Sequence, residues 1–91
     1  MRDKEVLRKF FVLWALDNFH KPSTKDICDR TGIAEVSVKR AISSLRAIFG
    51  MRIVVVREDK KTYYTIVGWG VLNASKFRAQ YNGYAWHNLP I

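Results

Sequence analysis

Residues 24 to 45 read TKDICDRTGIAEVSVKRAISSL, and this stretch predicts two short helices joined at one glycine. Ser23 can cap the first helix, and Asp26 three residues later completes a variant of the capping box. We therefore expect this helix to begin at about Thr24. Gly32 follows its last turn, where a left-handed residue is most easily glycine, so the helix should end there.

The second helix of this stretch is predicted over residues 34–49, with Gly50 as its C-terminal stop. Its apolar residues recur at helical spacing, and most of them should face the core. They are Val36, Val38, Ala41, Ile42 and Leu45. The outward face should carry Glu35, Ser37, Lys39, Arg40, Ser43, Ser44 and Arg46. This mixture of short polar and basic side chains suits phosphates and base edges.

The run G-I-x-E-x-S-V-K-R-A-I at residues 32–42 resembles the helix-turn-helix of bacterial transcription regulators. Ala34 stands where such motifs often place a serine or threonine cap, so the second helix begins uncapped or a neighbouring group caps it. The resemblance implies DNA contacts by this helix. It assigns Glu35, Val36 and Arg40 to base edges, and Ser37 and Lys39 to phosphates.

Two runs rich in β-forming residues follow, at residues 51–57 and 62–67, with the charged residues EDKK between them. They predict a hairpin. Three helices followed by a hairpin resemble the winged-helix fold, and the resemblance covers residues 4–67. We expect an α+β chain, mainly α: a three-helix core with the helix-turn-helix, a β-hairpin wing, a short C-terminal helix and an aromatic tail.

The predicted wing is basic, and on the winged-helix interpretation its tip approaches phosphates or the minor groove. The alternative is that charges at the tip only keep a strand edge soluble. We favour contact with DNA through the wing, at residues 57–62. The side chains expected to act mainly on phosphates are Lys39, Arg46, Arg57, Lys60 and Lys61.

The net charge of +8 is unevenly distributed along the 91 residues. Residues 36–57 hold five basic and no acidic side chains, whereas residues 1–35 hold seven basic and six acidic ones. The excess begins at the proposed recognition helix. This asymmetry favours a polyanionic partner, and we expect double-stranded DNA rather than a membrane surface.

The first predicted helix starts near Asp3 and contains FFVLWAL at residues 10–16, which is apolar all round and must be covered on more than one side. Residues 71–81 allow a short helix with Asn73 as its candidate cap, and an aromatic tail follows to residue 91. The aromatic rings pack back on the first helix or across a homodimer interface, and we favour the homodimer. The residues in question are Phe10, Phe11, Trp14, Tyr81, Tyr84 and Trp86, with Leu89 and Ile91 in the tail.

Length and motifs argue against several other classes of protein. Ninety-one residues allow a single domain, with residues 68–91 as an extension for packing or dimerisation. The isolated His20 and His87 and the single Cys28 form no metal-binding spacing, and no phosphate-binding glycine motif occurs. We expect no cofactor, no metal and no enzymatic activity. The chain has no signal-peptide pattern, and its longest apolar run is too short to cross a bilayer.

These observations predict a winged helix-turn-helix DNA-binding protein, a bacterial transcription regulator in the cytoplasm and on the nucleoid. Two alternatives remain: a winged-helix module for docking other proteins, and the DNA-binding part of a plasmid or phage replication protein. The sequence identifies neither a target DNA sequence nor an effector ligand.

Overall fold

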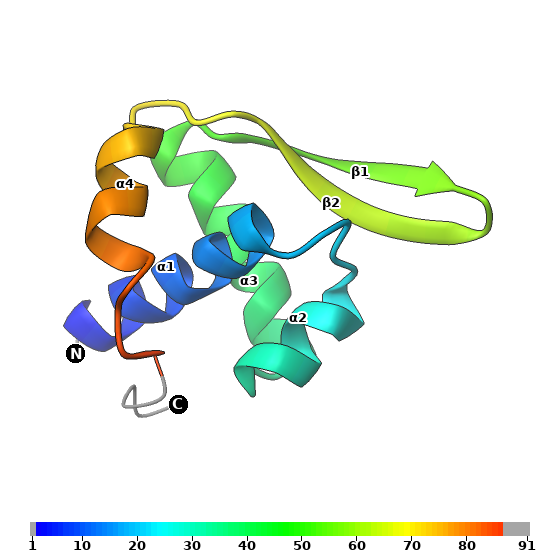
Figure 1. The fold of residues 1–91 in the computed structure, drawn as a ribbon, viewed down its shortest axis with the longest axis horizontal. Coiled ribbons are helices and arrows are strands. Elements are labelled where there is room, and N and C mark those ends of the chain that lie inside the picture. The colour runs from blue at the N-terminus through cyan, green and yellow to red at the C-terminus, as the bar shows by residue number, and fades with distance from the viewer. Residues whose placement is uncertain (1, 87–91) are drawn as a thin grey trace.

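Four helices and one β-hairpin form the part of the chain that the structure describes, namely the backbone of residues 2–86 and the side chains of residues 5–86. The structure is a computed structural model, and Figure 1 shows its arrangement. The predicted coarse class, α+β and mainly helical, is confirmed. In chain order the elements are α1 (Arg2–Asn18), α2 (Thr24–Thr31), α3 (Glu35–Phe49), β1 (Arg52–Glu58), β2 (Lys61–Gly68) and α4 (Ala74–Tyr81).

Helix α2 begins and ends where its capping residues predict. The Asp26 N–H donates to Ser23 Oγ at 3.1 Å, and the Ser23 N–H donates to Asp26 Oδ2 at 3.0 Å, which completes the capping box. Gly32 ends the helix with φ 78°, and its N–H donates to the Cys28 carbonyl. The buried Thr31 hydroxyl donates to the Ile27 carbonyl at 2.7 Å. Local chemistry therefore sets both ends of α2.

Helix α3 starts without a side-chain cap. Ala34 has the extended backbone of an N-cap residue, with φ −63° and ψ 151°, but within the described part of the chain no side-chain hydrogen bond caps the helix. Of the two alternatives left open by the sequence, the uncapped start is the one observed. Gly50 adopts φ 67° and donates its N–H to the Leu45 carbonyl, which ends α3 at the predicted position.

The core lies where α1 packs on α2 and α3. Helix α1 also contacts β2. Aromatic side chains join α1 to α4, so its apolar run is covered on more than one side, as predicted. Within the described residues, no helix combines the length and the apolar character needed to cross a membrane. The large side chains that are almost fully buried are Val12, Leu13, Ile27, Ile33, Val38, Ile42 and Leu45.

The aromatic residues at the two ends of the chain pack together within one molecule. Phe11 and Trp86 stack with their ring centroids 4.8 Å apart and their planes at 4°, and Trp86 is only 6% exposed. Phe10 and Tyr81 approach to 5.4 Å. Trp14 and Tyr84 both border Trp86. All six rings considered for a dimer interface thus have intramolecular partners, and the homodimer stays a prediction. Leu89 and Ile91 lie outside the described residues.

The hairpin has a tighter turn than the sequence suggested. Glu58 and Lys61 were expected in the connection, but they pair with each other at the ends of β1 and β2, and only Asp59 and Lys60 form the turn. Both turn residues have positive φ, 48° and 67°, as a type I′ turn requires. This turn matches the twist of the strands, so the ladder extends one residue further on each side than predicted.

Contacts with the connection between α1 and α2 hold the hairpin in place. The Tyr64 N–H donates to the Pro22 carbonyl at 2.9 Å, and the Tyr64 hydroxyl is 3.0 Å from Thr24 Oγ1. Lys21 Nζ lies 2.6 Å from Glu58 Oε1 near the turn. The hairpin is therefore attached to the helices at two places along its length, although it projects well beyond them in Figure 1.

Helix α4 begins at Ala74 rather than at the predicted Val71. Asn73 caps it as expected, because its side chain accepts from the Lys76 N–H at 2.9 Å. The preceding residues form a turn against the end of α3 instead. The Val71 N–H donates to the Phe49 carbonyl, and a Cβ on Gly70 would lie 2.0 Å from that same oxygen. This close approach leaves room for glycine alone.

Candidate functional site

The outward face of α3 carries most of the residues singled out in the sequence. Val38 and Leu45 are fully buried, which turns Lys39, Arg40 and Ser43 toward solvent. Val36 was counted among the apolar residues of α3, most of which should face the core, yet it is 58% exposed. Its outward position agrees with the one that the helix-turn-helix resemblance assigned to it.

Two of the charges on this face already neutralise each other. Lys39 Nζ lies 3.0 Å from Glu35 Oε2, one helical turn away. The hydrogen bond and the charge of Glu35 raise the pKa of the Lys39 ammonium. Lys39 would have to exchange this partner to bind another anion. Arg40, by contrast, is exposed and forms no ion pair with the residues that the structure describes.

Arg46 has a structural role that the sequence did not indicate. Its Nε and Nη2 atoms both donate to the Ile53 carbonyl oxygen, at 3.0 and 2.6 Å. These hydrogen bonds occupy the guanidinium group in the free protein, and the predicted contact with phosphate stays a prediction. Arg46 joins the last turns of α3 to the start of the hairpin.

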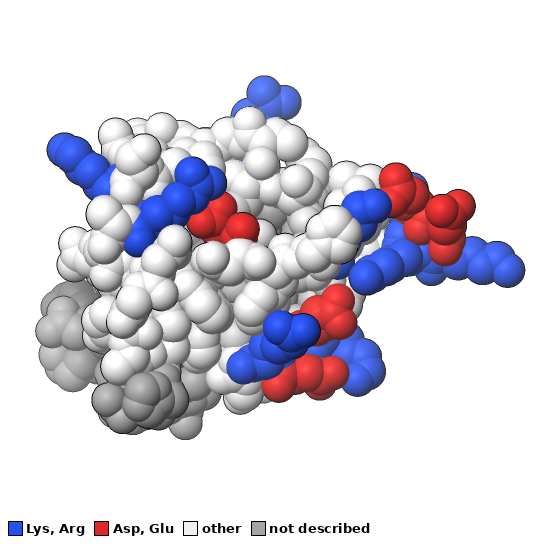
Figure 2. All heavy atoms as spheres, viewed as in Figure 1, with Lys and Arg blue, Asp and Glu red and all other residues white. Residues whose placement is uncertain are grey.

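The remaining predicted residues lie on the hairpin, away from α3. Arg57, Lys60 and Lys61 are all exposed. Figure 2 shows charged side chains of both signs gathered at this end of the molecule and over α2, whereas the middle of the same face carries few charges. Glu58 is paired with Lys21, so the acidic charge of β1 is partly neutralised. The hydrogen bond to Lys21 lowers the pKa of Glu58.

A hollow between α1 and α3 adds residues that the sequence analysis missed. Its volume is about 170 Å³. The sequence signal for Arg8 and Lys9 is their spacing from Glu5, which places all three on one side of a helix. We call this space between the two helices the α1–α3 hollow. Its polar lining consists of Glu5, Arg8 and Lys9 from α1 and Ser37, Arg40 and Ser44 from α3.

The chemistry of these surfaces is that of hydrogen-bond donors and positive charge. The polar lining of the α1–α3 hollow has a single carboxylate and neither histidine nor cysteine. Within the described residues, no three His, Cys, Asp or Glu side chains come together as ligands for a metal ion. Such an arrangement can bind an anion.

Comparisons with known proteins concern the fold. The chain is similar to the crystal structure of a DUF2131 family protein from Shewanella amazonensis SB2B, determined at 2.50 Å resolution. The TM-score is 0.75 at 21% sequence identity, and the match covers 89% of this chain and 84% of the other. At this identity the similarity shows a shared fold alone. No protein-family model matches the chain, and no curated protein matches it either.

Proposed function

We propose that this chain is a winged-helix DNA-binding protein, a transcription regulator that reads duplex DNA with α3 and contacts the backbone with the β1–β2 hairpin. The observation that carries the proposal is the outward face of α3. There Arg40 is exposed and without an ion pair among the described residues, beside Val36 and Ser43, which are also exposed. Arginine can donate two hydrogen bonds to guanine in the major groove, and an apolar side chain can contact the methyl group of thymine.

The charge distribution supports the same proposal. Residues 36–57 hold five basic side chains and no acidic one, and they include all of α3 except its first residue, Glu35, and all of β1 except its last, Glu58. Protein–DNA association is driven largely by neutralisation of phosphates, so a one-sided excess of this kind is typical of a DNA-binding surface. The hairpin follows α3 directly and is held to the α1–α2 connection, which supports a defined position of Lys60, at its turn, relative to α3.

The proposal is tested by measuring binding to a random-sequence duplex at several salt concentrations. We expect log K to fall linearly with log salt, by about 0.9 for each phosphate contacted. A variant with Lys39, Arg40 and Lys60 all replaced by alanine should bind more weakly and with a smaller slope. As a control, Lys76→Ala removes a basic side chain from α4 and should change little.

Two results would contradict the proposal. One is equal binding of the duplex by the wild type and the triple variant, provided that circular dichroism shows both to be folded. The other is binding that does not depend on salt. Either result would favour the alternative of a docking module for other proteins.

A further inference from the structure

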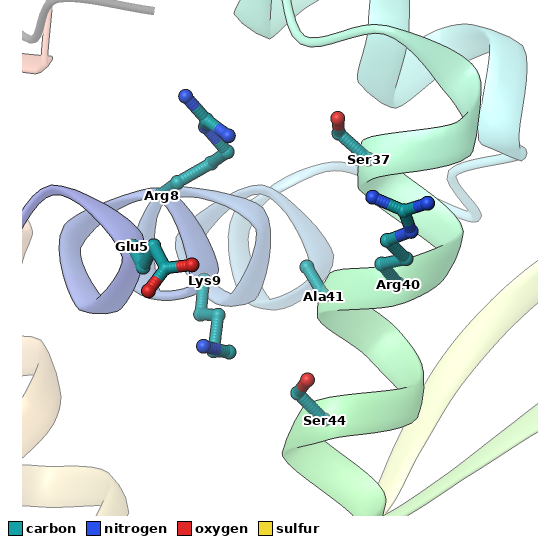
Figure 3. Close-up of a pocket in the computed structure, with 7 residues that line it drawn as sticks. All are labelled: Glu5, Arg8, Lys9, Ser37, Arg40, Ala41 and Ser44. Carbon is teal, nitrogen blue, oxygen red and sulfur yellow. The ribbon is translucent and has the colours of Figure 1, made fainter. Parts of the chain in front are cut away.

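The α1–α3 hollow brings donors from two helices to one small space. In Figure 3, Arg8 of α1 and Ser37 of α3 border one end of it, and Lys9 and Ser44 border the other. The methyl group of Ala41 lies between the two serines. The volume of about 170 Å³ can hold a tetrahedral oxyanion and a few waters, since one water takes up about 30 Å³ in the liquid.

Among the described residues, the basic side chains of the hollow outnumber its carboxylates. Arg8, Lys9 and Arg40 form no ion pair with the described residues. Other basic residues of the chain are paired, for example Lys25 with Asp29 at 2.9 Å. With one acidic residue, Glu5, against three basic ones, the hollow has a formal charge of +2. Arg8 and Lys9 are also half-buried, so their attraction for an anion is less screened than on an open surface.

The serine hydroxyl groups of the hollow add hydrogen-bond donors for an anion, but they give no specificity for a large ligand. Ser37 and Ser44 are half-buried, and neither side chain is hydrogen-bonded to a described residue. The lining of the hollow includes no aromatic ring for stacking a base and no amide for reading one. These side chains can recognise a phosphate group but not the molecule attached to it.

We propose that the α1–α3 hollow binds one phosphate group, and that in the DNA complex this group is a backbone phosphate beside the groove entered by α3. The statement that this group is a DNA phosphate rests on the proposed function. Arg40 connects the two sites, because it lines the hollow and also belongs to the exposed face of α3. A phosphate held between Arg8 and Ser37 would set the position of α3 along the duplex.

The first experiment uses inorganic phosphate alone, at constant ionic strength, with amide chemical shifts as the measurement. We expect saturable shifts at Arg8, Ser37 and Ser44. Arg8→Ala should weaken binding at least five-fold, whereas Glu5→Gln should strengthen it several-fold because it removes the opposing carboxylate. Lys76→Ala serves as the matched control and should bind like the wild type. Shifts that do not saturate, or equal affinities in wild type and Arg8→Ala, would overturn the proposal.

The second experiment uses duplexes in which one phosphate at a time is replaced by an uncharged methylphosphonate. For the wild type we expect that replacement of the phosphate weakens binding at only a small number of positions in the duplex. At one of them the loss of affinity on modification should be smaller for Arg8→Ala than for the wild type, because one of the side chains that sense that charge is gone. If Arg8→Ala keeps the full sensitivity at every position, the DNA half of the proposal is wrong.

The two experiments separate this proposal from the proposed function. Salt-dependent duplex binding that Arg8→Ala leaves unchanged would overturn the phosphate site but not DNA binding. Saturable phosphate binding in the hollow by a wild type that binds no duplex would do the reverse. It would establish the phosphate site as one for a free phosphate-bearing ligand and refute its DNA half.

Discussion

The guanidinium group of Arg46 donates two hydrogen bonds to a single atom, the carbonyl oxygen of Ile53, at 3.0 Å from Nε and 2.6 Å from Nη2. The two residues are close in sequence, but they lie on different elements, α3 and β1. This contact spans the connection at Gly50, where the chain leaves α3 and enters the hairpin. It therefore helps to set the direction in which the hairpin leaves the helices.

Arg46→Ala should destabilise the fold and loosen the hairpin. Hydrogen bonds from charged groups contribute about 1.5–3 kcal/mol, and because Arg46 is exposed we expect a loss of about 1 kcal/mol in the free energy of unfolding. Urea unfolding measures this loss, and faster amide exchange at Ile53 would report the loosening. Arg57→Ala provides the comparison, because Arg57 lies on the same strand as Ile53. It should change the stability by less than about 0.5 kcal/mol. Equal stability of both variants would show that the Arg46 contact contributes nothing.

The missing cap of α3 offers a stabilising substitution. Ala34 already has extended backbone angles, so Ala34→Ser should place a hydroxyl group where it accepts from the first turn of α3. We expect a gain of about 1 kcal/mol, and Ser23→Ala at the start of α2 should lose a similar amount. Thermal unfolding of both variants measures the changes. A destabilised Ala34→Ser would mean that the cap site is blocked.

The capping box also predicts a dependence of stability on pH. The Ser23 N–H donates to the Asp26 carboxylate, and this hydrogen bond is the main cause of the lowered pKa of Asp26. A carboxyl group whose pKa is lower in the folded state adds stability above its unfolded pKa of about 3.9. That stability is lost as the pH falls through the folded pKa.

Asp26→Asn tests this linkage directly. The variant should be less stable than the wild type at pH 7, and the difference should shrink below about pH 4, when the wild-type carboxyl group becomes protonated. Chemical unfolding at a series of pH values gives the two curves. A difference that stays constant down to the lowest pH would refute the assigned role of the charge.

The packing of Trp86 on Phe11 provides a test of whether the protein is a monomer or the predicted homodimer. Trp86→Ala should cost about 3 kcal/mol of stability, because it removes a large buried ring from a stacked pair. If the contact is intramolecular, the unfolding midpoint of the wild type should not change with protein concentration. A midpoint that rises with concentration would show that stability depends on a second subunit. Val71→Ala, at an 81% exposed residue, is the control.

Two substitutions distinguish base recognition from phosphate contact on the proposed DNA surface. Arg40→Ala should lower the affinity for a preferred duplex by about 1–3 kcal/mol and affect other duplexes less. Lys60→Ala should weaken all duplexes to a similar extent and reduce the salt slope by about one unit. Selection of sites from a random library supplies the preferred duplex. If both variants weaken all duplexes equally, Arg40 contacts phosphate rather than a base.

Features that depend on a few neighbouring residues could be predicted from the sequence. The capping box of Ser23 and Asp26 and the left-handed Gly32 set the limits of α2 by local hydrogen bonds. The two-residue hairpin turn was missed because Asp59 and Lys60 are not the glycine-containing pairs that usually signal a type I′ turn.

Contacts between distant elements could not be predicted. Lys21 and Glu58 are 37 residues apart, and nothing in either segment indicates their pairing. The α1–α3 hollow likewise exists because the two helices pack against each other, which brings Arg8 and Ser37 to the same hollow. For the proposed site, the sequence therefore identified the exposed face of α3 but not the residues of α1 that extend it.

The attachment of Tyr64 to Pro22 and Thr24 has a consequence for any ligand that touches both α3 and the hairpin. The conformational entropy of the hairpin is already lost when the chain folds, so a ligand does not have to order it on binding. Such a ligand meets two surfaces with a fixed separation. Ligands are then distinguished by whether their own charges match that spacing, and a mismatch cannot be relieved by moving the hairpin without breaking these hydrogen bonds.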